Sequence, residues 1–262
     1  MTPSVTNLAR KPTVREQASA EEWGLRVELA ACYRVAAALG WEDSIYTHFS
    51  VRIPGPERHY LLNPLGYLFD EVTASSLVKV DVDGNIILDA TGLGINPAGW
   101  VIHGAVHEAR EDAHCVIHTH TISGVAVSIL KDGLMPISQQ ALTIIHDLAY
   151  HDYEGIALDA DEKTRLVGHL GAKNYLMLRN HGLLTTGSTV GAAFTRMYAL
   201  SRTCEIQAQA LAGGRPLQTI APEVIGRVAQ QAGNGKMMTR NAALTWSAMM
   251  RRQDRRDQSY RD

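Results

Sequence analysis

Three histidines could together bind a metal ion. His118 and His120 end the apolar run Cys-Val-Ile-His-Thr-His, and strand geometry would place Val116, His118 and His120 on one face. His181 lies at an Asn-His-Gly break between two apolar runs, where the chain can turn sharply. Three neutral imidazoles with an open position are the ligand set of a catalytic Zn²⁺ or a similar divalent ion. The alternative is that these histidines are hydrogen-bonded structural groups. Mn²⁺ and Fe²⁺ remain alternatives to Zn²⁺, because the sequence does not fix the metal.

Composition restricts the class of protein. The chain has 262 residues, is 45% hydrophobic and carries a net charge of −2, which suits one large α/β domain or two smaller ones. Basic residues are dispersed except near the C-terminus, so we expect no nucleic-acid partner. The three cysteines lie in apolar segments, which argues against disulfides and for a reducing compartment. No run approaches the ~20 apolar residues of a membrane span, and the N-terminus lacks a signal-peptide core. We therefore expect a cytoplasmic protein without a membrane partner.

The pattern along the chain predicts a flexible arm over residues 1–18, one domain over 19–248 and a polar, solvated tail over 249–262. Ser19 and Glu22 form a capping-box pattern that begins a helix ending near Gly40. Further helices are predicted over 97–111, 162–170 and from Ser188 to Gly213, and strands over 49–53, 60–62, 78–82, 86–88, 115–120 and 175–178. Hairpins mixed with crossover helices indicate a layered α/β domain with a substantially antiparallel sheet. The absence of a Gly-x-Gly-x-x-Gly or Walker motif argues against nucleotide binding.

Several motifs, in order along the chain, resemble the class II aldolase/adducin family. They lie at 63–66, 73–79, 95–99, 118–121, 150–155 and 179–182, and the resemblance extends from about Glu22 to Gly214. It implies a three-layer α/β/α domain around a mainly antiparallel sheet. It also implies a small-molecule substrate and, as in the family's aldolases, a homotetramer with active sites near subunit boundaries. The Zn²⁺ ligands of those aldolases correspond to His118, His120 and His181.

The chain also departs from the sugar-phosphate aldolases of that family. Their acid/base glutamate lies nineteen residues before the first metal-ligand histidine, a position that Gly99 occupies here. Their phosphate-binding segments correspond to Thr47–His48, Leu65–Gly66 and Pro97–Ala98, where most hydrogen-bond donors are missing because proline has no N–H. The Asn-x-Ala-Gly segment at 96–99 instead resembles the adducin head domain, which is not known for catalysis.

Three functions are consistent with these residues. The first is a metal-dependent lyase, an aldolase or decarboxylase acting on a small carbonyl or hydroxy-acid compound that is not a sugar phosphate, in which the ion stabilises an enediolate. The second is another metal enzyme on the same scaffold, a decarboxylase or a non-haem iron oxygenase. The third is a non-catalytic, adducin-like assembly module. The catalytic candidates are His48, which precedes a strand, His103, which could face the metal or be satisfied in the core, and Tyr153, in a polar-aromatic cluster.

Overall fold

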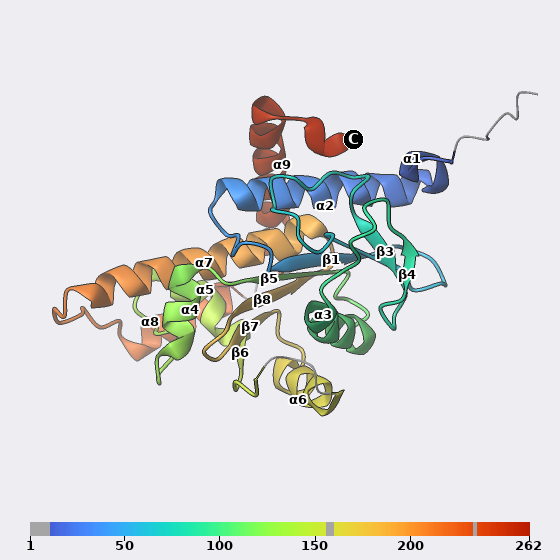
Figure 1. Ribbon diagram of the computed structural model, residues 1–262. Coiled ribbons are helices and arrows are strands. Elements are labelled where there is room, and N and C mark those ends of the chain that lie inside the picture. Colours follow the sequence, from blue (N-terminus) through green and yellow to red (C-terminus); the bar gives the residue numbers. More distant parts are fainter. Residues whose placement is uncertain (1–10, 156–159, 233–234) are drawn as a thin grey trace, which may run out of the picture.

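A mixed sheet of eight strands forms the centre of the molecule in the computed structural model, which describes residues 11–155, 160–232 and 235–262 (Figure 1). The strand order is β4-β3-β2-β1-β5-β8-β7-β6, and every neighbouring pair is antiparallel except β6 with β7. The bounds are β1 His48–Arg52, β2 Tyr60–Leu62, β3 Val78–Val80, β4 Ile86–Leu88, β5 Cys115–Thr119, β6 Leu148–His151, β7 Tyr175–Leu178 and β8 Gly182–Gly187. The predicted mainly antiparallel sheet is confirmed.

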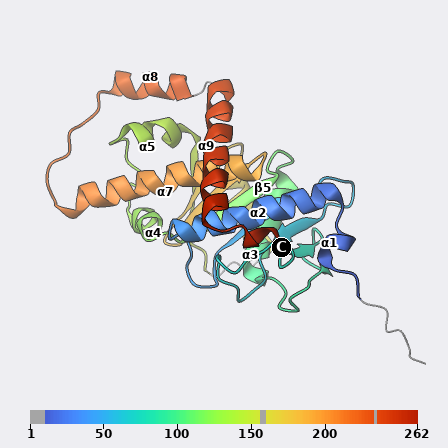
Figure 2. The same ribbon diagram turned by 90° about the horizontal axis from the view of Figure 1, so that it is seen from above.

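Helices cover both faces of this sheet, as the predicted α/β/α arrangement requires. Figure 1 shows α3 and α6 on one face and α2 and α7 on the other, while α9 crosses over α2 and α7 (Figure 2). The helices are α1 Val14–Gln17, α2 Ala20–Ala38, α3 Pro97–Ala109, α4 Ile122–Ile129, α5 Gln139–Ile144, α6 Ala160–Leu170, α7 Val190–Ala212, α8 Pro222–Ala232 and α9 Gly235–Arg256, with 3₁₀ turns at Ile145–Asp147 and Ser259–Arg261. The long helix α7 begins after Thr189, whose hydroxyl accepts from the amide of Ala192, and not after Ser188.

Successive side chains of β5 point alternately into the two hydrophobic cores on either face of the sheet, and this alternation sets the direction of His118. Cys115 and Ile117 pack into the larger core beneath α2 and α7, whereas Val116 packs into the core beneath α3 and α6. His118 follows Val116 on the same face because the side-chain period of a strand is two. The strand pattern therefore points His118 toward the α3 side of the sheet, on the face that it shares with Val116.

The N-terminal segment is more ordered than the predicted arm. Residues 1–10 lie outside the described ranges, but Val14–Gln17 is a helical turn with a capping box between Thr13 and Glu16, and the side chain of Val14 is buried. An arm reaching to residue 18 is therefore wrong for residues 13–18. The short turn carries too few apolar residues for a periodic pattern to reveal it.

The capping box predicted at Ser19 is only half formed. The Ser19 hydroxyl accepts from the amide of Glu22, but the Glu22 carboxylate does not return to Ser19. It accepts instead from Nε of Arg26 at 2.9 Å and from Nζ of Lys79 at 2.8 Å in a buried position. The carboxylate thus pairs with a buried guanidinium and a half-buried ammonium group in place of one backbone amide.

The C-terminal segment contradicts the predicted solvated tail over 249–262. Helix α9 continues to Arg256, the side chains of Gln253 and Tyr260 are buried, and the carbonyl of Tyr260 accepts from the amide of Ala74. The many arginine and aspartate residues at the end of α9 make the sequence look fully exposed. One face of the helix is nevertheless packed, and it carries Met249 and Gln253, which are four residues apart. The domain boundaries at 19 and 248 remain predictions.

Candidate metal centre

Two strand pairings and one tight turn bring the histidines together. His48 in β1 lies opposite His118 in the antiparallel β1–β5 pair, and His181 precedes β8, the other neighbour of β5. Asn180 has a φ of 58°, the left-handed conformation that lets the chain turn after β7. A β-carbon on Gly182 would lie 2.5 Å from the carbonyl oxygen of Thr119, so glycine allows β8 to start this close to the end of β5.

His118, His120 and His181 form a compact cluster. Each offers one ring nitrogen, and the three nitrogens lie within 4.8 Å of one another. Ring centroids are 4.7 Å apart for His118 and His120 and 4.8 Å apart for His181 with either partner. The three residues that the sequence spacing selects therefore do come together, although they lie on two separate segments.

Hydrogen bonds at the Nδ1 atoms of His118 and His120 orient the two rings so that their Nε2 atoms point toward each other. Nδ1 of His118 lies 2.9 Å from the carbonyl oxygen of Leu183, and Nδ1 of His120 lies 2.9 Å from a carboxylate oxygen of Asp43. Both oxygens only accept, so both Nδ1 atoms donate. When the two rings are neutral, each Nε2 carries a lone pair, and these two atoms face each other at 2.9 Å. Two lone pairs at that distance repel, and a cation between them removes the repulsion, which fits a divalent metal.

Burial favours the neutral, metal-binding form of these rings. It lowers the pKa of His181 to about 4, with a further lowering from His120 and His151. It also lowers the pKa of His118 well below its ordinary value, again with neighbouring histidines adding to the effect. Metal ligands must be deprotonated, so the environment prepares both side chains to bind a cation at neutral pH.

Asp43 and the carbonyl of Leu183 are site residues that the sequence prediction missed. Partners of this kind orient the ligand imidazoles and raise their basicity. Asp43 lies in the loop before β1 and reaches His120 only because β1 pairs with β5. The one local signal is an acidic residue shortly before a strand, which is too common to identify it.

The catalytic candidates His48 and His103 belong to one buried hydrogen-bonded chain. Nδ1 of His48 lies 3.0 Å from Nε2 of His103, and Nδ1 of His103 lies 2.6 Å from Oγ of Ser50. The same hydroxyl lies 2.7 Å from Nε2 of His107, whose Nδ1 lies 2.8 Å from the carbonyl oxygen of Ala113. His103 is fully buried, and each of its ring nitrogens has a hydrogen-bond partner in the core.

His48 is the member of this chain that lies beside the metal cluster, with its ring centroid 5.3 Å from that of His118. Its ring occupies the space in which a side chain at position 99 would begin. A β-carbon on Gly99 would lie 2.2 Å from Nε2 of His48, far inside van der Waals contact. Glycine therefore fits at position 99, because the His48 ring fills the volume that a side chain there would need.

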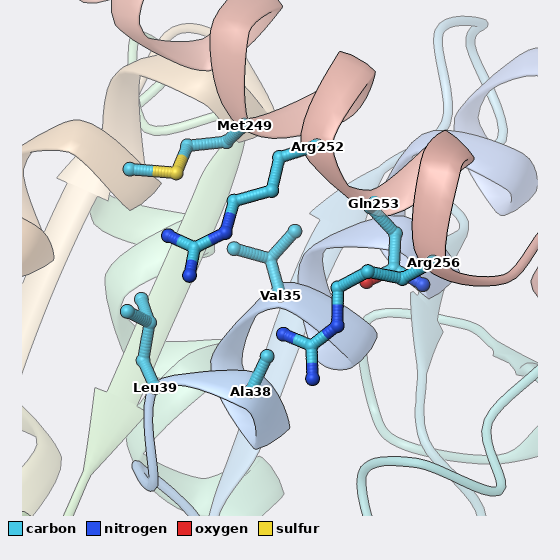
Figure 3. Close-up of a pocket in the computed structure, with 7 residues that line it drawn as sticks. All are labelled: Val35, Ala38, Leu39, Met249, Arg252, Gln253 and Arg256. Atoms are coloured by element: carbon cyan, nitrogen blue, oxygen red, sulfur yellow. The ribbon is translucent and has the colours of Figure 1, made fainter.

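The third candidate, Tyr153, lies apart from the cluster. This residue is 56% exposed and lines a hollow of about 230 Å³ that is shared with His181, His151, Glu154 and Arg179. His181 lines the same hollow, so Tyr153 lies near the histidine cluster but is not part of it. A second hollow, between α2 and α9, is lined by Val35, Leu39, Met249, Arg252 and Arg256 and contains none of the clustered histidines (Figure 3).

Comparison with known proteins identifies the family. Residues 27–208 match the family model described as "Class II Aldolase and Adducin N-terminal domain". The protein therefore belongs to the class II aldolase/adducin family, and the resemblance in its motifs is confirmed. Among the described residues, no helix is both long enough and apolar enough to span a bilayer.

Three relatives show how far the similarity reaches. An aldolase II superfamily protein from Pseudomonas syringae is 52% identical, with a TM-score of 0.90, and the match covers 96% of this chain and 100% of that one. An L-fuculose 1-phosphate aldolase from Glaciozyma antarctica is 27% identical, with a TM-score of 0.80 and 97% of both chains covered. Mouse alpha-adducin is 48% identical over 190 residues, which span 72% of this chain and 26% of adducin.

Proposed function

We propose that this protein is a metal-dependent carbon–carbon lyase, of the aldolase or decarboxylase type, that acts on a small carbonyl or hydroxy-acid compound. The observation that carries this proposal is the pair of Nε2 atoms on His118 and His120, which face each other at 2.9 Å while both Nδ1 atoms are held by oxygens. His181 completes a set of three histidine ligands, and a catalytic metal held by three protein ligands keeps a further position for water or substrate. When bound there, a divalent ion such as Zn²⁺ supplies Lewis-acid polarisation of a carbonyl.

A sugar phosphate is not the substrate in this proposal, although a relative carries the name of an L-fuculose 1-phosphate aldolase. At the start of α3, the side chain of Asn96 accepts from the amides of Ala98 and Gly99, and Pro97 has no amide proton to offer. The amide of Leu65 donates to the carbonyl of Gly94. The amides of Leu65, Ala98 and Gly99 are therefore already used within the chain and are not free to hold a phosphate.

The similarity to alpha-adducin favours a second candidate, an assembly module without catalysis. A module of that kind has no need for two imidazoles whose lone pairs face each other, because such a pair is unfavourable without a cation. Among metal enzymes, a decarboxylase or an iron oxygenase with Mn²⁺ or Fe²⁺ would use the same histidines.

We further propose a cytoplasmic homotetramer, for which light scattering in solution gives the test of assembly.

The test begins with the metal content of protein purified without added metal. We expect about one divalent ion per chain, which His118→Ala and His181→Ala both lose, whereas His146→Ala, at an exposed histidine, retains it. Metal-loaded wild-type protein is then screened for retro-aldol cleavage and decarboxylation of unphosphorylated carbonyl and hydroxy acids, with L-fuculose 1-phosphate as the comparison. Full metal occupancy in both ligand variants would refute the metal centre, and rapid cleavage of only the sugar phosphate would refute the substrate class.

A further inference from the structure

The buried chain that ends at His48 has a fixed hydrogen-bond direction, because it begins at a backbone carbonyl. The carbonyl of Ala113 only accepts, so Nδ1 of His107 carries the proton in their 2.8 Å contact. Burial lowers the pKa of His107 to about 3, so this ring is neutral at neutral pH. Its Nε2 therefore has a lone pair and accepts from the neighbouring hydroxyl of Ser50.

The direction then passes through Ser50 to the next two rings. A hydroxyl has one proton, and Ser50 donates it to Nε2 of His107. The oxygen of Ser50 therefore accepts from Nδ1 of His103 at 2.6 Å. Burial also lowers the pKa of His103 well below its ordinary value, which keeps that ring neutral. Its Nε2 then accepts from Nδ1 of His48 at 3.0 Å. Each member of the chain thus has only one arrangement of protons.

We propose that this chain fixes His48 as the Nδ1–H tautomer, whose Nε2 is a permanent hydrogen-bond acceptor beside the metal centre and binds a hydroxyl group of the substrate. The assignment of a substrate contact rests on the proposed function, whereas the tautomer does not. His48 is then the specificity-determining residue, and Ser50, His103 and His107 are positioning residues. A lone pair attracts a hydroxyl proton and repels an anionic oxygen, so the site selects hydroxy-carbonyl compounds over their phosphate esters.

The position of Nε2 supports this role. It lies against the backbone of Gly99, where a β-carbon would be 2.2 Å away, and the ring lies 5.3 Å from that of His118 between centroids. Throughout the ranges that the structure describes, no group forms a hydrogen bond with this nitrogen. The other ring nitrogen is held in the core, so the imidazole cannot rotate to exchange the two.

The tautomer is tested directly by nuclear magnetic resonance on the full chain with ¹⁵N-labelled histidine. Two-bond correlations between ring carbon protons and ring nitrogens distinguish a protonated Nδ1 from a protonated Nε2, and His48→Gln identifies the signals of His48. We expect a protonated Nδ1 and an unprotonated Nε2 in metal-free and zinc-loaded protein. A protonated Nε2 at neutral pH would overturn the inference, whatever the metal and activity measurements show.

The selection is tested with dihydroxyacetone and dihydroxyacetone phosphate, which share a carbonyl and differ in one hydroxyl. Calorimetric titration of zinc-loaded protein gives the ratio of their two dissociation constants, and we expect about tenfold or more in favour of the unphosphorylated probe. Ser50→Ala breaks the chain and should reduce this preference at least about threefold, with a mixture of His48 tautomers in the spectrum. The attraction of the metal for phosphate is the same in the wild type and in Ser50→Ala, so it cancels when the preferences of these two proteins are compared.

Ser201→Ala is the matched control, because Ser201 is a buried serine on α7 that is not part of the hydrogen-bonded chain from His107 to His48. It should change neither the preference nor the spectrum of His48. A wild-type protein without the expected preference, including one that binds neither probe, would overturn the selection. Failure of the protein to bind metal would instead refute the proposed function and leave the spectroscopic result on the tautomer standing.

Discussion

Asp43 and His120 join the loop before β1 to the metal cluster through a contact of 2.9 Å between a carboxylate oxygen and Nδ1. The His120 side chain is mostly buried, whereas that of Asp43 is half exposed, so the carboxylate lies at the edge of the site. It holds the ring with Nε2 directed toward His118. In the proposed metal centre this contact would align a ligand before the metal binds, so its loss should weaken binding without removing any ligand.

We expect Asp43→Ala to weaken metal binding about 10- to 100-fold, since this is the usual effect of losing a group that orients a metal-ligand histidine. Asp43→Asn retains an acceptor for the Nδ1 proton and should have a smaller effect. The measurement is competition with a chelator of known affinity. Glu42→Ala removes the neighbouring exposed carboxylate and should leave the affinity unchanged. Equal affinities for wild type and Asp43→Ala would show that the contact does not orient the ligand.

A second prediction concerns the absence of a side chain at position 99. We expect Gly99→Ala to lower the free energy of unfolding by about 1–3 kcal/mol, because its β-carbon would overlap Nε2 of His48 and displace a ring that is held in the core. Gly99→Glu meets the same obstacle and should not create activity toward sugar phosphates. Urea unfolding with a chelator present measures the stability apart from metal binding.

Gly24→Ala provides the control for this change. Gly24 is exposed within α2, and a β-carbon there would meet no atom within 4 Å. Alanine in a helix interior is favoured over glycine by about 0.5–1 kcal/mol, so this variant should be more stable than wild type. If Gly99→Ala were stabilising in the same way, the close approach of His48 to the α3 backbone would be wrong.

Local sequence patterns predicted which histidines come together better than they predicted the residues around them. The period of two placed His118 and His120 together, and the Asn-His-Gly break placed His181 at a turn, because both signals lie within a few residues. The contacts of Asp43 and Ser50 depend on the pairing of β1 with β5, and the strand order follows from packing of the whole sheet. Strand β6 was not predicted either, because its four residues are too few for a clear alternation of buried and exposed side chains, and its two central residues, Ala149 and Tyr150, are both half-buried.

The last prediction is a loss of stability in acid that depends on His107. Burial lowers the pKa of this histidine from about 6.5 to about 3 in the folded protein. Above pH 6.5 the ring is neutral in both states and has no effect. Below that pH the unfolded chain takes up a proton that the folded chain does not, so stability is lost as the pH falls from about 6.5 toward 3.

His107→Gln is the informative variant, because an amide can still donate to the carbonyl of Ala113 and accept from Ser50. Between pH 6.5 and 4.5 we expect the wild-type protein to lose up to about 2 kcal/mol more of its unfolding free energy than the variant loses. Urea midpoints at both pH values, with chelator present, give the difference, in which the contributions of the other histidines cancel. Parallel pH dependence in the two proteins would mean that His107 takes up its proton equally in the folded and unfolded states, and the fixed proton order of the chain to His48 would then lose its starting point.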